Sequence, residues 1–244
     1  MASNANATRF MFPRWANYLL PLLVLGAVGG GLYVPVVIGF GLSADTLWRG
    51  YAPAQPVPFS HALHAGELGM DCRYCHTTVE DASFAAIPHT QVCISCHSPE
   101  DNIAGVRKNS ELLGPVHASY ETGESVEWIK VHDQPDYVYF SHSAHVNRGV
   151  SCVECHGRVD RMERVYMAEN MSMAWCLDCH REPEQALRPV DEVTNLAWDP
   201  RDELGVSRDT MTRAEAQRRV GLELKDEYNI HNRTYMTSCS TCHR

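Results

Sequence analysis

One long apolar segment lies near the start of the chain, and the sequence after it is polar with only short apolar runs. Residues 15–44 contain no charged side chain, and Leu19 to Leu42 is almost wholly apolar or glycine. About 20 apolar residues suffice to span a bilayer, so this segment predicts one transmembrane helix. A cleaved secretory signal is the alternative, because glycines lie near the middle, although its apolar core is usually shorter.

The charges that flank this segment predict its orientation. Arg9 and Arg14 precede it, and no acidic residue comes before Asp45. The positive-inside rule then places residues 1–14 in the cytoplasm and residues 45–244 outside the membrane. We therefore expect a single-pass protein of the inner (cytoplasmic) membrane whose main domain lies on the periplasmic side.

Two further patterns occur toward the C-terminus. Thr212-Arg213-Ala214-Glu215 fits a capping box, which predicts a helix through about Lys225. Residues 182–209 are rich in proline and charge, which predicts an extended segment that wraps over the domain or a neighbouring subunit. A solvated loop is the alternative for this segment.

Composition narrows the classes of function. The 244 residues carry a formal net charge of -9, and such an acidic surface repels phosphate backbones, so we expect no nucleic acid partner. The unusual feature is the presence of 13 histidines and 10 cysteines. Cysteines at this density indicate disulfides, metal ligands or haem attachment, and their spacing decides among these.

Every cysteine belongs to a Cys-x-x-Cys-His unit, and the unit occurs five times. Two thiols three positions apart can form thioethers with the two vinyl groups of one haem, and the next histidine then lies beneath the iron as its proximal ligand. Zinc ribbons, thioredoxin-like redox pairs and structural disulfides compete with this interpretation for a single copy. Five copies with no stray cysteine favour covalent haem.

We therefore expect five covalently bound haem c groups. The cofactor-binding cysteines are Cys72, Cys75, Cys93, Cys96, Cys152, Cys155, Cys176, Cys179, Cys239 and Cys242. The proximal iron ligands are His76, His97, His156, His180 and His243. Only about 40 residues outside the membrane serve each haem, which is too little for a conventional side-chain core. The predicted fold class is a multihaem cytochrome c with little regular secondary structure, short α-helices around the haems and one N-terminal transmembrane helix.

An internal repeat organises the expected haem domain. Its two copies are Pro58-Phe59-Ser60-His61-Ala62-Leu63-His64 and Tyr139-Phe140-Ser141-His142-Ser143-Ala144-His145. Two histidines at i and i+3 lie near one face of a helical turn, from which each can reach a different haem. We predict a first two-haem module at residues 45–125, a second at residues 126–190, and a C-terminal segment with the fifth haem at residues 191–244.

Phe-x-His-x-x-His ahead of Cys-x-x-Cys-His resembles the class III cytochromes c and their small trihaem relatives. The resemblance implies that the first histidine ligates the haem just downstream and the second ligates the next one. It also implies that a histidine four positions before a haem cysteine serves a later haem. The implied distal ligands are His61 for the Cys72 haem, His64 for the Cys93 haem, His142 for the Cys152 haem, His145 for the Cys176 haem, and His89 for a fifth iron, with the Cys239 haem as candidate.

Five other side chains remain to be placed. We expect His117 to be solvent-exposed or to bond a haem propionate. His132 directly precedes the second module and His231 lies near the last haem, so either is an alternative distal ligand. Met171 and Met173 occupy the region of the second module where the first has its third histidine, and Met173 is the first choice for one His/Met haem. Packing on porphyrin is the alternative for both methionines.

The order of elements along the chain resembles the pentahaem cytochrome c subunit of alternative complex III. Residues 131–140 (VHDQPDYVYF) and 173–181 (MAWCLDCHR) also carry this resemblance. It implies a subunit that relays electrons in a quinol-oxidising respiratory complex toward a periplasmic cytochrome c or terminal oxidase. The implied partners are an iron–sulfur protein, quinone-binding membrane subunits and a monohaem cytochrome. We expect an electron-transfer subunit, with no catalytic residues of its own.

Two other functions compete with this one. A stand-alone quinol dehydrogenase of the membrane-bound tetrahaem type also has one N-terminal helix, but its first haem unit lies near the membrane and it lacks paired-histidine modules. Here Cys72 lies 27 positions after Asp45, and the modules are present. A multihaem reductase enzyme such as nitrite reductase has a lysine in place of one proximal histidine, and no such variant occurs here.

Overall fold

The computed structural model describes residues 13–41, 49–100 and 105–243. The chain divides into two compact units, residues 1–47 and residues 48–244. Arg9 and Asp45, on which the predicted orientation depends, lie outside the described residues.

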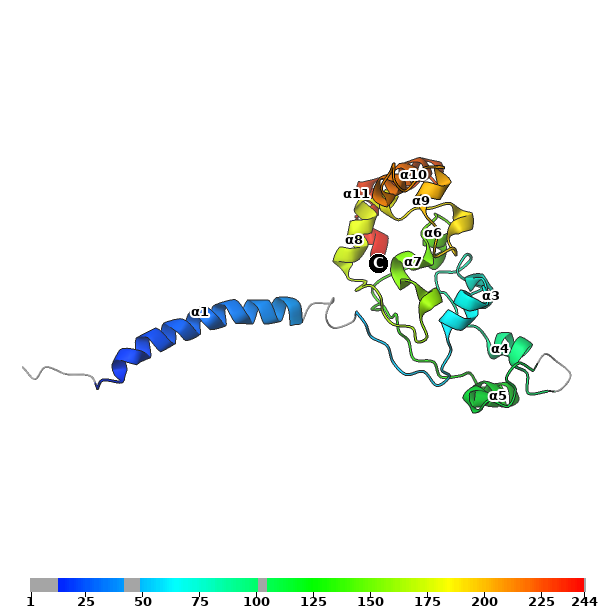
Figure 1. Cartoon of the computed structure of the whole chain (residues 1–244), viewed down its shortest axis with the longest axis horizontal. Helices are drawn as coiled ribbons and strands as arrows, with labels where there is room; N and C mark the ends of the chain where they lie inside the picture. The colour runs from blue at the N-terminus through cyan, green and yellow to red at the C-terminus, as the bar shows by residue number, and fades with distance from the viewer. Residues whose placement is uncertain (1–12, 42–48, 101–104, 244) are drawn as a thin grey trace, which may run out of the picture. The chain divides into compact units, whose positions relative to one another are not determined.

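The described residues of the first unit form one helix, α1 (Ala16–Gly41), drawn in blue in Figure 1. Its 26 residues are mostly apolar, and at about 1.5 Å per residue they are long enough to cross a bilayer. None of its residues is buried against the protein. The predicted span is thus confirmed as an apolar helix that could cross a membrane, although a signal sequence near the N-terminus can meet the same criteria of length and composition.

The second unit is helical, and its described residues form no β-strand, only two isolated bridges. Four of its elements are short 3-10 helices and one, η1, is a π-helical turn. In chain order the elements are η1 (Ala62–Glu67), α3 (Cys72–Cys75), α4 (Thr90–His97), η2 (Glu111–Leu113), α5 (Gly114–Thr122), α6 (His142–Val146), α7 (Cys152–His156), η3 (Val159–Arg161), α8 (Met173–Arg181), η4 (Pro183–Gln185), η5 (Val190–Glu192), α9 (Pro200–Glu203), α10 (Arg213–Glu227), α11 (Arg233–Met236) and α12 (Cys239–Cys242).

Two small hydrophobic clusters hold this unit together. Their buried members are Leu187, Trp198, Val220 and Leu224 in one, and Val57, Ile94 and Val116 in the other. Many large apolar side chains near the Cys-x-x-Cys-His units are exposed instead, namely Leu68, Tyr74, Phe84, Tyr137, Tyr139, Phe140 and Met173. The predicted short helices are confirmed, and the polypeptide leaves apolar surface beside its cysteine units that a flat apolar group would cover.

Residues 182–209 differ from the predicted extended segment. They form η4, η5 and α9, and Leu187 and Trp198 pack against α10. The side-chain amide of Gln217 donates to the Leu187 carbonyl at 2.6 Å, which fixes the segment on that helix. The segment folds because α10 has an apolar face to cover, which the proline and charge content of the segment does not reveal.

The predicted capping box at the start of α10 is confirmed. The Thr212 side chain accepts from the backbone N–H of Glu215, and the Glu215 carboxylate accepts from the backbone N–H of Thr212. The helix extends to Glu227, two residues beyond the predicted end.

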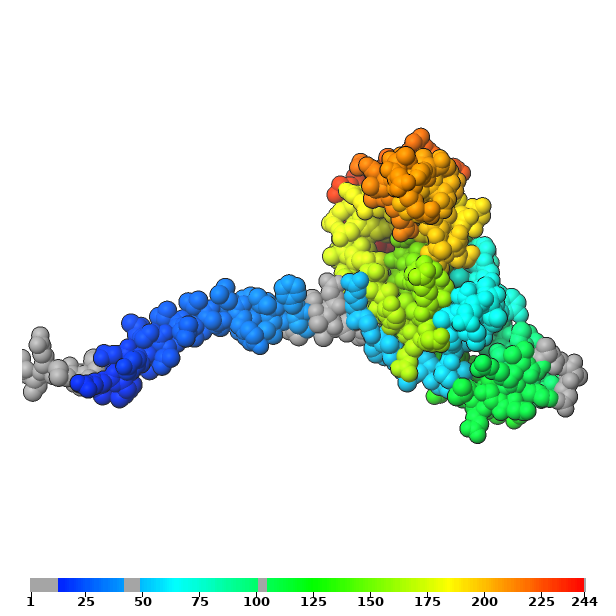
Figure 2. Space-filling view, in the orientation of Figure 1, coloured from blue at the N-terminus to red at the C-terminus, as the bar shows by residue number. Residues whose placement is uncertain are grey.

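Within the second unit, α4 and α5 lie at one end and α9 and α10 at the other, with α3, α6, α7 and α8 between them (Figure 1). In Figure 2 the red C-terminal residues are visible at the bottom of a hollow between the yellow residues of α8 and the green residues that include α7. The five cysteine units are therefore distributed along the whole unit and do not gather at one point.

Candidate functional site

Each Cys-x-x-Cys-His unit forms or ends a short helix. The cysteine pairs lie on α3, α4, α7, α8 and α12. Residues at i, i+3 and i+4 share one helix face, so each helix presents two thiols and one imidazole together. Side-chain caps fix where three of these helices begin: Asp71 accepts from Arg73 N–H, Ser151 from Val153 N–H, and Ser172 from Trp175 N–H.

Four of the five unit histidines are oriented in the same way. Each donates its Nδ1–H to a backbone carbonyl: His76 to Ala86 at 3.0 Å, His97 to Val106 at 2.7 Å, His180 to Met236 at 2.9 Å, and His243 to Tyr137 at 3.0 Å. A carbonyl bond at Nδ1 fixes the tautomer and leaves Nε2 with a free lone pair. This is the arrangement that a histidine needs to coordinate a metal through Nε2.

Three histidines of the internal repeat are also oriented by a hydrogen bond from Nδ1 to a backbone carbonyl. His64 Nδ1 donates to Ser60 at 2.8 Å, and His145 Nδ1 donates to Ser141 at 2.7 Å, so the two copies match. His142 Nδ1 donates to the Ser83 carbonyl at 3.0 Å, which joins the second module to the loop after α3.

Three of these histidines each face a unit histidine, and the distance between the two ring centres is nearly the same in all three pairs. The ring centres are 6.1 Å apart for His64 and His97, 6.1 Å for His145 and His180, and 6.4 Å for His142 and His156. When two imidazoles bind one iron, each nitrogen lies about 2 Å from the iron and roughly 1 Å from the centre of its own ring. The two ring centres are then about 6 Å apart. The residues therefore fit six-coordinate haem at three positions.

A fourth position shows a related arrangement. His61 and His76 lie within electrostatic reach of each other, and His61 Nδ1 is buried without a hydrogen-bond partner.

His132 Nε2 is likewise buried and unpartnered, and the His132 ring lies edge-on to that of His156 at 4.4 Å. That distance is too short for an iron between those two rings, so His132 is not placed as the partner of His156.

Burial keeps several of these rings neutral. Burial, together with the neighbouring His132 and His142, lowers the pKa of His156 to about 3. It lowers the pKa of His61 to about 4 and also lowers the pKa of His145. Neutral imidazole is the form that coordinates metals, so the environment favours ligation.

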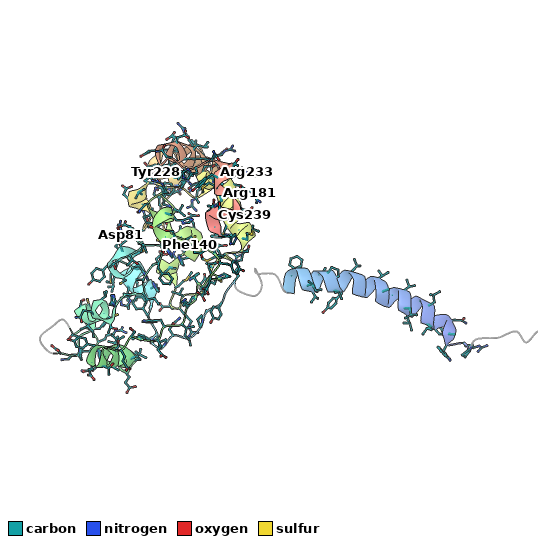
Figure 3. All side chains as sticks on the ribbon, turned by 180° about the vertical axis from the view of Figure 1, so that it is seen from behind. Asp81, Phe140, Arg181, Tyr228, Arg233 and Cys239 are labelled. Atoms are coloured by element: carbon teal, nitrogen blue, oxygen red, sulfur yellow. The ribbon has the colours of Figure 1, made fainter. Side chains whose placement is uncertain are left out.

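One phenylalanine supports both histidines in each copy of the repeat. Phe59 meets His61 edge-on at 4.8 Å and stacks on His64 at 4.3 Å. The second copy repeats this geometry, because Phe140 meets His142 edge-on at 4.8 Å and stacks on His145 at 4.6 Å. Figure 3 shows Phe140 in the middle of the second unit.

Replacing Phe140 with leucine should loosen both histidines of the second copy without removing them. Loss of the two ring contacts should cost roughly 1 kcal/mol of stability and should alter the electron paramagnetic resonance g-values of two haems. Tyr120→Leu is the matched control, since that ring is 37% exposed and contacts no histidine ring among the described residues. Identical spectra and melting temperatures for both variants would contradict the role of Phe140.

The other predicted ligands are not brought opposite a unit histidine. His89 is exposed at the start of α4, and its side chain has no ring contact or hydrogen bond among the described residues. Met173 begins α8 and is 64% exposed, and His231 packs on Tyr235 at 4.1 Å. His117 differs from its predicted exposed position: it is half-buried and its Nε2–H donates to the His97 carbonyl at 2.9 Å.

No disulfide joins any two of the ten cysteines, and no group of three or more metal-binding side chains gathers in the part of the chain that the structure describes. Burial holds the Cys155 thiol protonated, with a pKa raised to about 12. Electrostatic interactions between thiols show which cysteine units are neighbours in space. The interacting thiols are Cys93 with Cys75, Cys72 with Cys152, Cys155 with Cys176 and Cys179, and Cys176 with Cys242. In space, the units therefore follow the order second, first, third, fourth and fifth.

Sequence reasoning missed one charged pair at this site. Arg188 is buried, and its guanidinium donates to Glu154, which stands between the two cysteines of the third unit, at 2.7 Å. The signal in the sequence was weak. Arg188 lies between an apolar residue and a proline in a segment otherwise rich in charge.

Comparisons with known proteins agree with this chemistry. Residues 138–244 match the protein family described as cytochrome c7 and related cytochrome c. The multihaem cytochrome c subunit of menaquinone reductase from Nitratidesulfovibrio vulgaris is 37% identical over 126 residues, which cover 52% of this chain and 56% of that protein. The chain thus spans about half the length of the curated relative that it matches. The described residues, which are helical and contain no β-strand, have a multihaem cytochrome c fold.

Proposed function

We propose that this multihaem cytochrome c carries five haem c groups and relays electrons as a membrane-anchored subunit of a quinone-linked respiratory complex. The observation that carries the proposal is the set of histidine pairs with ring centres 6.1 to 6.4 Å apart, each including the histidine of a Cys-x-x-Cys-His unit. That separation is the one expected when both imidazoles bind a single iron between them.

The residues that hold each haem have three different roles: covalent attachment, proximal ligation and distal ligation. Each cysteine pair forms two thioethers, and the unit histidine that follows is the proximal ligand. The proposed distal ligands are His61, His64, His142 and His145 for the first four units, and His89 for the fifth, with Met173, His132 or His231 as alternatives. Bound haem c supplies one reversible electron at its iron. With both axial positions filled by protein, the irons should be low-spin and should not bind substrate.

The membrane anchor and the side of the membrane belong to the same proposal. Helix α1 is long enough to span, and Arg14 precedes it. We propose that residues 45–244 face the periplasm, where they would meet a cytochrome c or terminal oxidase. Protease added to intact spheroplasts should then remove the haem-staining domain.

We further propose that the complex oxidises quinol and is of the alternative complex III type, with iron–sulfur, quinone-binding and monohaem partners. The relative from menaquinone reductase supports a quinone link but favours the opposite direction, quinone reduction, as a second candidate. The cysteine units follow one another in space from α4 to α12. Such a linear order is suited to a relay in which electrons enter at one end and leave at the other.

The test compares the native complex with the isolated full chain, using a short-chain quinol. Reduction of the haems by quinol in the complex, but not in the isolated chain, is the expected result. Haem reduction in the isolated chain would favour the stand-alone quinol dehydrogenase. A complex that only reduces quinone from an added electron donor would favour the second candidate.

A further inference from the structure

Arg188 is the largest fully buried side chain of the described residues, with 1% of its surface exposed. Its Nη1 donates to the Asn195 carbonyl at 2.9 Å, its Nη2 donates to Glu154 Oε1 at 2.7 Å, and its guanidinium lies over the Trp198 ring at 5.0 Å. Its Nε is buried without a partner. A buried guanidinium stays charged because its pKa is far above neutral, so the fold maintains a permanent cation here.

The backbone holds this cation in place. The Arg188 N–H donates to the Gly149 carbonyl at 2.9 Å, and Val150 and Leu187 form an isolated bridge. Gly149 has a φ of +77°, and a Cβ there would clash with the Arg188 carbonyl oxygen. Only glycine permits this approach, so the segment after α8 is fixed against the start of α7.

The pair formed by Arg188 and Glu154 lies at the third and fourth cysteine units. Glu154 stands between Cys152 and Cys155 on α7. The charge of Arg188 acts on the Cys152 thiol, and the charge of Glu154 acts on the thiols of Cys155 and Cys179. The side chain of Glu154 is 33% exposed while that of Arg188 is 2% exposed, so the cation is the less screened of the two.

A structural role alone explains this pair poorly. Burying two charges costs desolvation that their attraction offsets only in part, and apolar residues of similar size are often as stable. A fixed charge beside a redox centre has a second effect, because a reduced haem carries one positive charge fewer than an oxidised one. A nearby cation favours the reduced form and a nearby anion favours the oxidised form.

We propose that Arg188 and Glu154 are a potential-setting pair for the haems bound at the third and fourth units, in which Arg188 raises the reduction potential and Glu154 lowers it. This inference rests on the proposed haem attachment at Cys152 and Cys155. Neither residue ligates iron, so both act through the electric field at the site.

The test is a spectroelectrochemical titration of the full chain with its haems. Glu154→Gln is isosteric and keeps an acceptor for Nη2, and at least one redox component should move to higher potential. The double variant R188Q/E154Q removes both charges and should move that component back toward its original potential. Arg188→Lys keeps the charge but loses hydrogen bonds, so it should lower the melting temperature and leave the potentials in place.

Asp199→Asn is the matched control. Asp199 pairs with Arg201 at 2.6 Å in the same segment, and it acts on no cysteine thiol among those with shifted pKa values. Unmoved potentials in Glu154→Gln, or an equal shift in Asp199→Asn, would overturn the inference. Haem content separates this failure from that of its premise. If C152A/C155A retains as much covalent haem as the unchanged chain, the attachment itself is wrong.

Discussion

His145→Ala should convert one haem in five from low-spin to high-spin. The His145 ring faces His180 at 6.1 Å, stacks on Phe140, and is held by the Ser141 carbonyl, so its loss should remove the proposed distal ligand of the iron that His180 binds. The variant should gain a high-spin electron paramagnetic resonance signal and bind carbon monoxide at one iron, while its total haem content stays unchanged.

His117→Ala is the matched control for this ligand. His117 donates to the His97 carbonyl at 2.9 Å and is not a proposed iron ligand, so its loss should leave all irons low-spin. A high-spin signal in His117→Ala, with none in His145→Ala, would mean that the ligand assignment inferred from the ring distances is wrong.

Replacing Cys239 and Cys242 together with alanine should lower the covalent haem content from five groups to four. The fifth unit lies at the C-terminal end of the chain on α12, so the other four units should keep their folds and their haems. Pyridine haemochrome analysis of denatured, washed protein measures the change directly.

Ser240→Ala tests the same helix without touching a thiol, and its haem content should equal that of the unchanged chain. An unchanged haem content in the double cysteine variant would show that the fifth unit is not an attachment site. It would then be a spare dithiol, and the pentahaem proposal would fail.

The local features of this protein could be predicted from its sequence. The cysteine units, the paired histidines and the capping box at Thr212 each depend on residues within a few positions of one another, so spacing alone fixes which side chains share a face. The apolar run that became α1 is equally local. The structure adds that both copies of the repeat place phenylalanine and histidine rings at closely similar distances.

Long-range features could not be predicted in this way. The carbonyls that orient the imidazoles come from distant residues, such as Ser83 for His142 and Met236 for His180, and a carbonyl leaves no trace in sequence. The burial of Arg188 against Glu154 likewise depends on how α10 packs on the segment before it. The charge and proline content of that segment predicted an extended chain, because this content gives no sign that the segment packs on α10.

The fifth haem shows the limit of carrying a family pattern onto this chain. His89 is the implied ligand, yet it directly precedes α4 at one end of the second unit, whereas the red C-terminal residues lie beside α8 (Figure 1), and it has no ring partner among the described residues. His243 is oriented by the Tyr137 carbonyl like the other unit histidines, so its Nε2 is ready for a metal.

Intact-mass spectrometry of the full chain under denaturing conditions tests the central claim most directly, because only covalently attached haem remains with the polypeptide. The account predicts the mass of the polypeptide plus five haem groups, with each of the ten cysteines consumed in a thioether. A mass that corresponds to four or fewer haems, or to free thiols at any Cys-x-x-Cys-His unit, would contradict it.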